Sequence, residues 1–215
     1  MTYLDLINGV LKRLRETTVT TADESAYSSL IGELVNDAKK QVEQSHKWTA
    51  LRTSITFPTV VDQTVYSLSN AKQNAVFEQA MNEATDRYLN IRPLSYFNEK
   101  TVLSTVTSGS PTEFMFDGTD TSNNLRVRLY PTPNVIETLR FDMVIPQADL
   151  TADGTNMTIP SNPVLQMAYG MALRERGETG GQSAAEQFAV ANAALNDAIA
   201  IDANRYENEL VYYRV

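Results

Sequence analysis

The spacing of apolar residues changes twice along the chain, and this change constrains the fold more than any other feature. Residues 4–14 and 27–48 have the 3.6-residue period of amphipathic helices. Helical spacing returns over residues 162–177 and 183–204. Between these ends, apolar and polar residues alternate as they do in strands with one buried face. The sequence therefore predicts two helices, a long β region and two further helices.

Five segments of the β region have the residue types and the alternation of strands. We expect residues 125–130 to pair antiparallel with residues 139–145, because the turn-forming residues 131–134 join them. Residues 71–98 are ambiguous, and within them residues 75–81 fit either a helical turn or a strand. The five predicted strands are Thr53–Phe57, Gln63–Leu68, Leu125–Tyr130, Leu139–Ile145 and Asn156–Ile159.

Polar residues near the expected helix ends indicate where those helices begin and end. Thr21 and Glu24, and again Ser183 and Glu186, have the spacing of a capping box, in which each side chain bonds the other residue's backbone N–H. Gly177 follows the third predicted helix and fits its C-terminus.

A pair of helices at each end of the chain predicts an α+β fold, with an antiparallel β domain inserted between the halves of a four-helix bundle. A chain of 215 residues is long enough for this, since single cores usually stop growing near ~250 residues. The predicted parts are the N-terminal helices of the bundle at 1–52, the inserted β domain at 53–161, the C-terminal helices of the bundle at 162–203, and a docking tail at 204–215.

Composition argues against several classes of function. The formal net charge of −8 opposes binding to nucleic acid phosphates by the chain as a whole. The absence of cysteine excludes disulfide frameworks and thiolate metal sites. We expect no enzyme activity, no catalytic residue, no cofactor and no metal. No apolar segment is long enough to span a bilayer and none resembles a secretion signal, so we also expect no membrane association.

His46 is the only histidine and the only candidate for a catalytic imidazole. Catalysis would require a nucleophile and an orienting partner within hydrogen-bond reach, and the sequence contains no nucleophile motif such as G-x-S-x-G. The favoured interpretation is a residue at a helix C-terminus, where the helix dipole stabilises a positive charge.

Two acidic clusters and three arginines also have two interpretations each. The clusters lack the residue spacing of calcium loops, so we interpret Asp117–Gly118 and Asp153–Gly154 as hairpin turns. Arg126, Arg128 and Arg140 could contact phosphate, but many acidic residues share their region. Cross-strand ion pairs are therefore the favoured interpretation.

The C-terminal segment concentrates large apolar side chains at a chain end, where residues are usually poorly ordered unless something holds them. The segment either folds back on the helices of its own chain or docks on a partner, and we favour docking. The residues that would make this contact are Tyr206, Leu210, Val211, Tyr212 and Tyr213.

The chain resembles a known family in several short motifs. Their order and spacing match over nearly the whole chain. They are Val35–Glu43, His46–Trp48 with Leu51–Arg52, Gly109–Pro111, Leu129–Pro133, Arg174–Glu178 and Ala194–Asp202. In these segments the chain resembles the head-to-tail adaptor proteins of tailed bacteriophages, which are related to the tail tubular protein A of short-tailed phages.

The resemblance implies a structural protein of the virion neck, assembled in the host cytoplasm. Such a protein forms a homo-oligomeric ring, expected to have twelve copies, beneath the portal protein. The ring extends the channel, through which genomic DNA passes without specific binding, and presents a platform to the tail nozzle or tail tube protein. The resemblance transfers portal docking to the C-terminal segment, at Tyr206, Leu210, Val211, Tyr212, Tyr213 and Arg214.

Three other functions remain open from the sequence. A tail-completion or neck protein would have the same composition but would contact the tail tube. A hydrolase would use His46 with a distant acidic residue. A soluble chaperone or regulatory binding module would stay monomeric in the presence of the portal.

Overall fold

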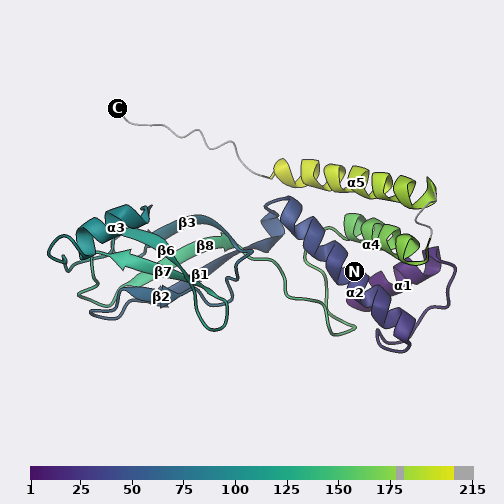
Figure 1. The fold of residues 1–215 in the computed structure, drawn as a ribbon, viewed down its shortest axis with the longest axis horizontal. Coiled ribbons are helices and arrows are strands. Elements are labelled where there is room, and N and C mark those ends of the chain that lie inside the picture. The colour runs from purple at the N-terminus through teal and green to yellow at the C-terminus, as the bar shows by residue number, and fades with distance from the viewer. Residues whose placement is uncertain (178–181, 206–215) are drawn as a thin grey trace. The chain divides into compact units, whose positions relative to one another are not determined.

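The computed structural model describes residues 1–177 and 182–205, which form two compact units (Figure 1). The helical unit contains residues 1–51 and the described residues from Pro146 onward, and the β unit contains residues 52–145. The chain therefore crosses between the units twice, at Leu51–Arg52 and at Ile145–Pro146. Helices and antiparallel sheets together confirm the predicted α+β class.

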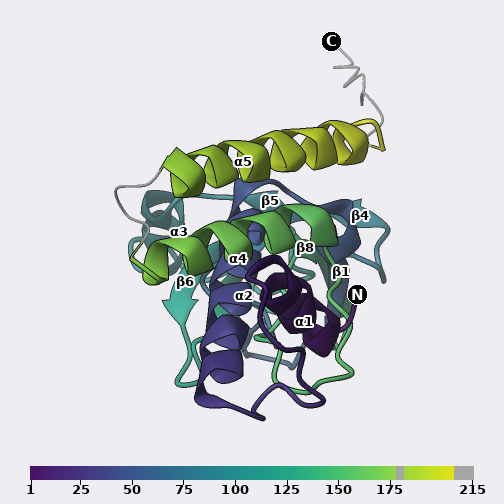
Figure 2. The same cartoon turned by 90° about the vertical axis from the view of Figure 1, so that its right-hand side faces the viewer.

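Four α-helices build the helical unit, with a short 3-10 helix, η1, at its first crossing. Helix α4 contacts each of the other three and lies between α5 and the pair formed by α1 and α2 (Figures 1 and 2). An apolar surface all round a helix is typical of one enclosed by others, and the buried residues of α4 include Val164, Leu165, Met167, Ala168 and Met171. The elements are α1 Tyr3–Arg13, α2 Ala26–Ser45, η1 Thr49–Leu51, α4 Ser161–Glu175 and α5 Gln182–Ala203.

Small residues let these helices approach closely. The buried alanines of α5 are Ala184, Ala191 and Ala198, which recur every seven residues and so lie on one face of the helix. On α4, a Cβ added at Gly170 would come 3.2 Å from the ring of Phe188. The packing of α5 on α4 therefore depends on short side chains from both helices.

The helix ends agree with the sequence in one case and differ in two. Gly177 follows α4 with a φ of 83°, as predicted for a helix C-terminus. The Thr21–Glu24 capping box is wrong, because α2 begins after Ser25 and Ser28 completes its cap. Helix α5 begins at Gln182, so Ser183 lies inside it.

The β unit contains two four-stranded sheets. The first has the order β1-β8-β3-β4, and the second has the order β2-β7-β6-β5, in which only the β5–β6 pair is parallel. The strands are β1 Arg52–Pro58, β2 Val65–Ser67, β3 Val76–Asn82, β4 Arg87–Tyr88, β5 Asn90–Ile91, β6 Glu113–Thr119, β7 Leu125–Tyr130 and β8 Thr138–Val144. The helix of this unit is α3, Leu94–Thr101.

The two sheets share one apolar core. Phe114 and Leu129 of the second sheet are buried in the same cluster as Phe141 and Met143 of the first. The rings of Phe114 and Phe141 meet edge to face, with centroids 5.2 Å apart. The alternation of apolar residues predicts which face of β7 and of β8 is buried. In both strands that predicted face points into the shared core.

The predicted pairing of residues 125–130 with residues 139–145 is wrong. Strand β7 lies between β6 and β2, with Leu129 opposite Phe114, whereas β8 lies between β1 and β3. The two strands belong to different sheets, because the connection between them carries the chain from one sheet to the other. Alternation predicts which face of a strand is buried, but it does not predict which strand is its neighbour.

Three further segments differ from their predictions. Residues 156–159 form no strand, and Asn156 makes only an isolated bridge to Thr2. Asp117–Gly118 lies inside β6, where the register with β7 shifts, and Gly118 has a φ of 71°. Asp153–Gly154 lies in a turn, but this turn does not join two strands, so it is not a hairpin.

Candidate functional site

The first candidate, His46, lies at the end of α2 and meets an acidic residue from the end of α5. Its Nε2 lies 3.2 Å from Oδ2 of Asp202, and its ring packs edge-on against Trp48 with centroids 5.1 Å apart. The structure thus brings the imidazole to a distant acid, as the hydrolase alternative requires. It also confirms that His46 follows a helix C-terminus.

The hydroxyl beside this pair is not placed as a nucleophile would be. The Oγ1 of Thr49 donates a hydrogen bond of 2.6 Å to Asp202, and the Thr49 N–H donates one of 2.9 Å to the same carboxylate. In a hydrolase triad the imidazole lies between the acid and the hydroxyl. Here the acid lies between the other two, so His46 does not activate the Thr49 hydroxyl.

The Asp202 carboxylate is built to stay ionised. Burial by itself would raise its pKa, but the hydrogen bonds from Thr49 and the nearby charges of His46 and Arg205 outweigh burial and lower it. The side chain of Arg205 lies 3.3 Å from the carboxylate. Asp202 therefore acts as a fixed acceptor that joins the ends of α5, α2 and η1.

A second buried cluster of charges lies on α2. Lys39 and Glu43 form an ion pair of 3.2 Å, with their side chains 0% and 1% exposed. Lys39 Nζ also donates to the backbone oxygen of Gln147 at 2.6 Å, and the Gln147 N–H donates to Glu43 at 3.2 Å. These two side chains hold the segment that follows the second crossing.

Of the three arginines, Arg128 and Arg140 pair with carboxylates, and only the pair of Arg128 is cross-strand, as the favoured interpretation predicts. Arg128 pairs with Asp117 across β7 and β6 at 2.7 Å, while Arg126 donates to the Asp117 backbone oxygen. Arg140 pairs with Asp142 on its own strand at 2.8 Å. A continuous cross-strand ladder is wrong, because Arg140 lies in the other sheet.

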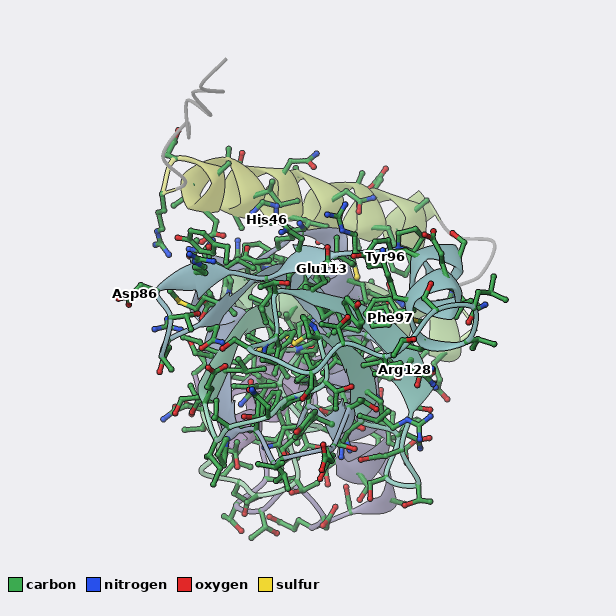
Figure 3. All side chains as sticks on the ribbon, turned by 90° about the vertical axis from the view of Figure 1, so that its left-hand side faces the viewer. His46, Asp86, Tyr96, Phe97, Glu113 and Arg128 are labelled. Carbon is green, nitrogen blue, oxygen red and sulfur yellow. The ribbon has the colours of Figure 1, made fainter. Side chains whose placement is uncertain are left out.

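A hydrogen-bonded cluster also fixes α3 on the outer face of the second sheet. Tyr96 donates from its hydroxyl to Glu113 (Figure 3). Arg92 Nε lies 3.0 Å from the same carboxylate. The hydrogen bond to Glu113, with burial and the charge of this carboxylate, raises the pKa of Tyr96 to about 12. This cluster sets where α3 lies and leaves its phenol protonated.

Seven exposed apolar side chains of the β unit lie on three of its loops. The Asp62 N–H donates to the Pro133 oxygen at 2.9 Å, and the Thr132 N–H donates to the Thr107 oxygen at 3.0 Å, so the loops are bonded to one another. Leu103 is 80% exposed and Ile136 is 74% exposed. We call this set the distal loop surface: Val60, Val61, Val102, Leu103, Val106, Val135 and Ile136.

The distal loop surface lies at a defined end of the first sheet. Pro58 pairs with Thr138 at that end, while Arg52 pairs with Val144 at the end where the chain crosses between the units. Sequence analysis missed this surface. Its signal is an apolar pair in an otherwise polar loop, as at Val60–Val61, Val102–Leu103 and Val135–Ile136.

Other predicted features are located as follows. Tyr206, Leu210, Val211, Tyr212, Tyr213 and Arg214 lie outside the described residues. Within residues 1–177 and 182–205, no group of three or more metal-ligating side chains could hold an ion. None of the helices in the same residues has the length and apolar character needed to cross a bilayer.

Comparison with known proteins identifies a family. A family model described as SU10 adaptor protein matches residues 1–212 of this chain. A search of curated proteins finds no match. The family match covers both units and most of the C-terminal segment.

Proposed function

The chain belongs to the SU10 adaptor protein family and is a structural adaptor of a bacteriophage virion, and from this premise we propose that it joins the head to the tail. It forms a ring on the portal protein, extends the DNA channel and presents a platform to the tail nozzle or tail tube. The observation that carries the proposal is the match over residues 1–212, which includes both units. No step of this function requires a chemical reaction.

The parts of the chain have separate roles in the proposal. Helices α1, α2, α4 and α5 act as one four-helix bundle, made from the helices of residues 1–52 and 162–203. The β unit, predicted at 53–161 and comprising residues 52–145, faces the tail, and the tail segment at 204–215 faces the portal. Assembly takes place in the host cytoplasm.

The portal contact is made by the C-terminal segment, through Tyr206, Leu210, Val211, Tyr212, Tyr213 and Arg214. Burial of its four central apolar residues contributes ~6–12 kcal/mol gross, which the ordering of these four residues at ~1.5 kcal/mol each partly offsets. One copy therefore binds weakly, whereas a ring binds tightly because all its copies engage together.

The tail platform is the distal loop surface. Exposed apolar residues that gather in one place are typical of protein-binding sites. The loops that carry them contain no lysine or arginine between residues 59–63, 102–108 and 131–137, so the surface has no cation for a phosphate. An apolar surface on another protein would therefore bind the distal loop surface. For an adaptor between head and tail, that other protein is the tail protein.

Subunit contacts within the ring are heterologous and close after a full turn. One surface that fits such a contact is the outer side of α5, where Val190 is 51% exposed and Ile201 is 62% exposed. Exposed alanines at positions 193 and 200 accompany them and permit close approach of a neighbouring copy. The resemblance described above favours twelve copies.

The charges of the chain suit passage of DNA without binding. The net charge of −8 repels phosphates, and Arg128 and Arg140 are already paired with carboxylates. A ring of such subunits offers few cations to which DNA could adhere.

A co-sedimentation assay with the portal protein tests the proposal. The intact chain should sediment with portal particles, and a chain shortened by residues 206–215 should fold but remain in the supernatant. Binding by the shortened chain would remove the docking segment from the proposal. Failure of the intact chain to bind portal, combined with binding to the tail tube, would favour the tail-completion alternative.

A further inference from the structure

One acidic side chain is buried among the loops that carry the distal loop surface. Ile136 of that surface is 74% exposed, whereas the next residue, Glu137, is only 7% exposed. The groups that donate to its two carboxyl oxygens are neutral, namely the side-chain amide of Asn82 and the hydroxyl of Ser110. Burying a carboxyl group without a cation beside it costs free energy, so this placement calls for a structural reason.

The carboxyl group of Glu137 joins two of the loops to the end of a strand. Asn82 is the last residue of β3 and is fully buried, and its Nδ2 donates to Oε2 at 2.7 Å. The Asn82 oxygen accepts the Ala84 N–H at 3.0 Å, which fixes how the amide is turned. Ser110, in the loop that precedes β6, donates to the other carboxyl oxygen. The loop of residues 131–137 and the loop before β6 are therefore both bonded through Glu137 to the first sheet.

The backbone of Glu137 holds the third loop. Its oxygen accepts the Thr59 N–H at 2.8 Å, and its N–H donates to the Thr59 hydroxyl at 2.8 Å. That hydroxyl donates in turn to the oxygen of Val135 at 2.9 Å, and Thr59 is buried. Each loop of the distal loop surface thus either contains Glu137 or is bonded to it.

We infer that Glu137 is a positioning residue, which holds the three loops of the distal loop surface in the arrangement that a partner binds. The inference rests on the proposed function only for the identity of that partner, the tail protein. A partner that meets loops already in place does not lose the free energy of ordering them, so it binds more tightly. The exposed apolar side chains make the contact, and the buried Glu137 acts through them.

Amide hydrogen exchange of the free protein, measured at single-residue resolution, tests the positioning role. The reporters are the amides of Asp62, Gly109 and Thr132, each of which bonds from one loop to another. Glu137→Met removes both carboxyl acceptors but keeps a side chain of similar length, so exchange at all three amides should rise about tenfold. Unchanged exchange in a folded Glu137→Met protein would overturn the inference.

Asp142→Leu is the matched control, because it removes another buried carboxyl group from the β unit. Asp142 bonds Ser54, Gln79 and Arg140, and none of these residues lies in the three loops. Asp142→Leu should therefore lower the free energy of unfolding but leave exchange at the three reporter amides unchanged. An equal rise in both variants would show that the loops respond to any loss of stability, and would overturn the inference.

Two milder variants test whether the hydrogen bonds of Glu137 account for its role. Glu137→Gln keeps an acceptor for Asn82 and can donate to the Ser110 hydroxyl, so its exchange should match the wild type. Ser110→Ala removes one donor and serves if Glu137→Met fails to fold, and exchange at Gly109 should then rise several-fold. A Glu137→Gln protein as fast as Glu137→Met, or an unchanged rate in Ser110→Ala, would count against these bonds.

Titration of the protein with the tail protein tests the consequence for binding. Glu137→Met should weaken binding about tenfold, whereas Asp142→Leu should bind like the wild type. Wild-type affinity in a Glu137→Met protein with faster loop exchange would overturn the link between positioning and binding. Absence of binding to the wild type would overturn the proposed platform, whereas exchange in the free protein would still decide whether Glu137 holds the loops.

Discussion

Lys39 and Glu43 form a fully buried ion pair across one turn of α2, and both side chains also bond the backbone of Gln147. Burial raises the pKa of Glu43 even though the charge and hydrogen bond of Lys39 lower it. Burying this pair therefore costs free energy. Its structural role is to fix the segment after the second crossing.

Lys39→Met should lower the free energy of unfolding by about 3–5 kcal/mol, because it leaves the Glu43 carboxylate buried without its partner. The double variant Lys39→Met with Glu43→Leu should lose less than the single variant, since no buried charge remains. Urea unfolding of the three proteins measures this order. A Lys39→Met protein as stable as the wild type would contradict it.

The contribution of Asp202 to stability should depend on acid pH. Its folded-state pKa is lowered, so protonation favours the unfolded chain. This contribution is complete above the unfolded-state pKa near ~4 and is lost as the pH falls through the folded-state pKa. The groups that face the carboxylate are His46, Thr49 and Arg205.

Asp202→Asn should therefore be less stable than the wild type at neutral pH, and the difference should shrink as the pH falls below ~4. Unfolding curves across this range, with Asp197→Asn as the matched variant, provide the measurement. A difference that grows on acidification would mean that the sign of the pKa shift is wrong.

Gly32→Ala should destabilise the contact between α1 and α2. A Cβ at this position would clash with the hydroxyl of Tyr3, whose ring is buried and has little room to move. We expect a loss of about 1–3 kcal/mol, as for other overpacked cores. Adding Tyr3→Phe removes the clashing atom and should recover part of the loss in thermal unfolding. Full additivity of the two changes would show that they do not interact.

Replacing Leu103 and Ile136 by serine should weaken attachment of the tail protein without loss of portal attachment. Both side chains are exposed, so stability should change by less than ~0.5 kcal/mol. Val76→Ser, at the opposite end of the first sheet, is the matched control. Pull-down with the tail protein and co-sedimentation with the portal separate the two contacts. Normal tail attachment by the double variant would exclude the distal loop surface as the platform.

The sequence predicts elements in this protein better than it predicts their neighbours. The alternation in β7 gives its bounds and its buried face, because these depend on residues next to each other in the chain. Its pairing with β6 depends on which sheet the chain enters after Tyr130. The spacing of apolar residues within one segment does not predict that. Strands β4 and β5 have two residues each and are too short to show any period.

The same limit applies to the candidate sites. Asp202 stands out in the sequence as an acid on an apolar helical stripe, but its partner Thr49 is 153 residues away along the chain. The apolar pairs of the distal loop surface are visible in the sequence, whereas their exposure follows from hydrogen bonds among three loops. A pattern along the chain can thus indicate an unusual residue without identifying what it contacts.

Negative-stain imaging of the purified protein, alone and mixed with its portal protein, tests the central claim most directly. We predict separate subunits or partial assemblies of the protein alone, and a complete added ring on one face of the portal in the mixture. Portal particles that look the same with and without this protein would contradict the account.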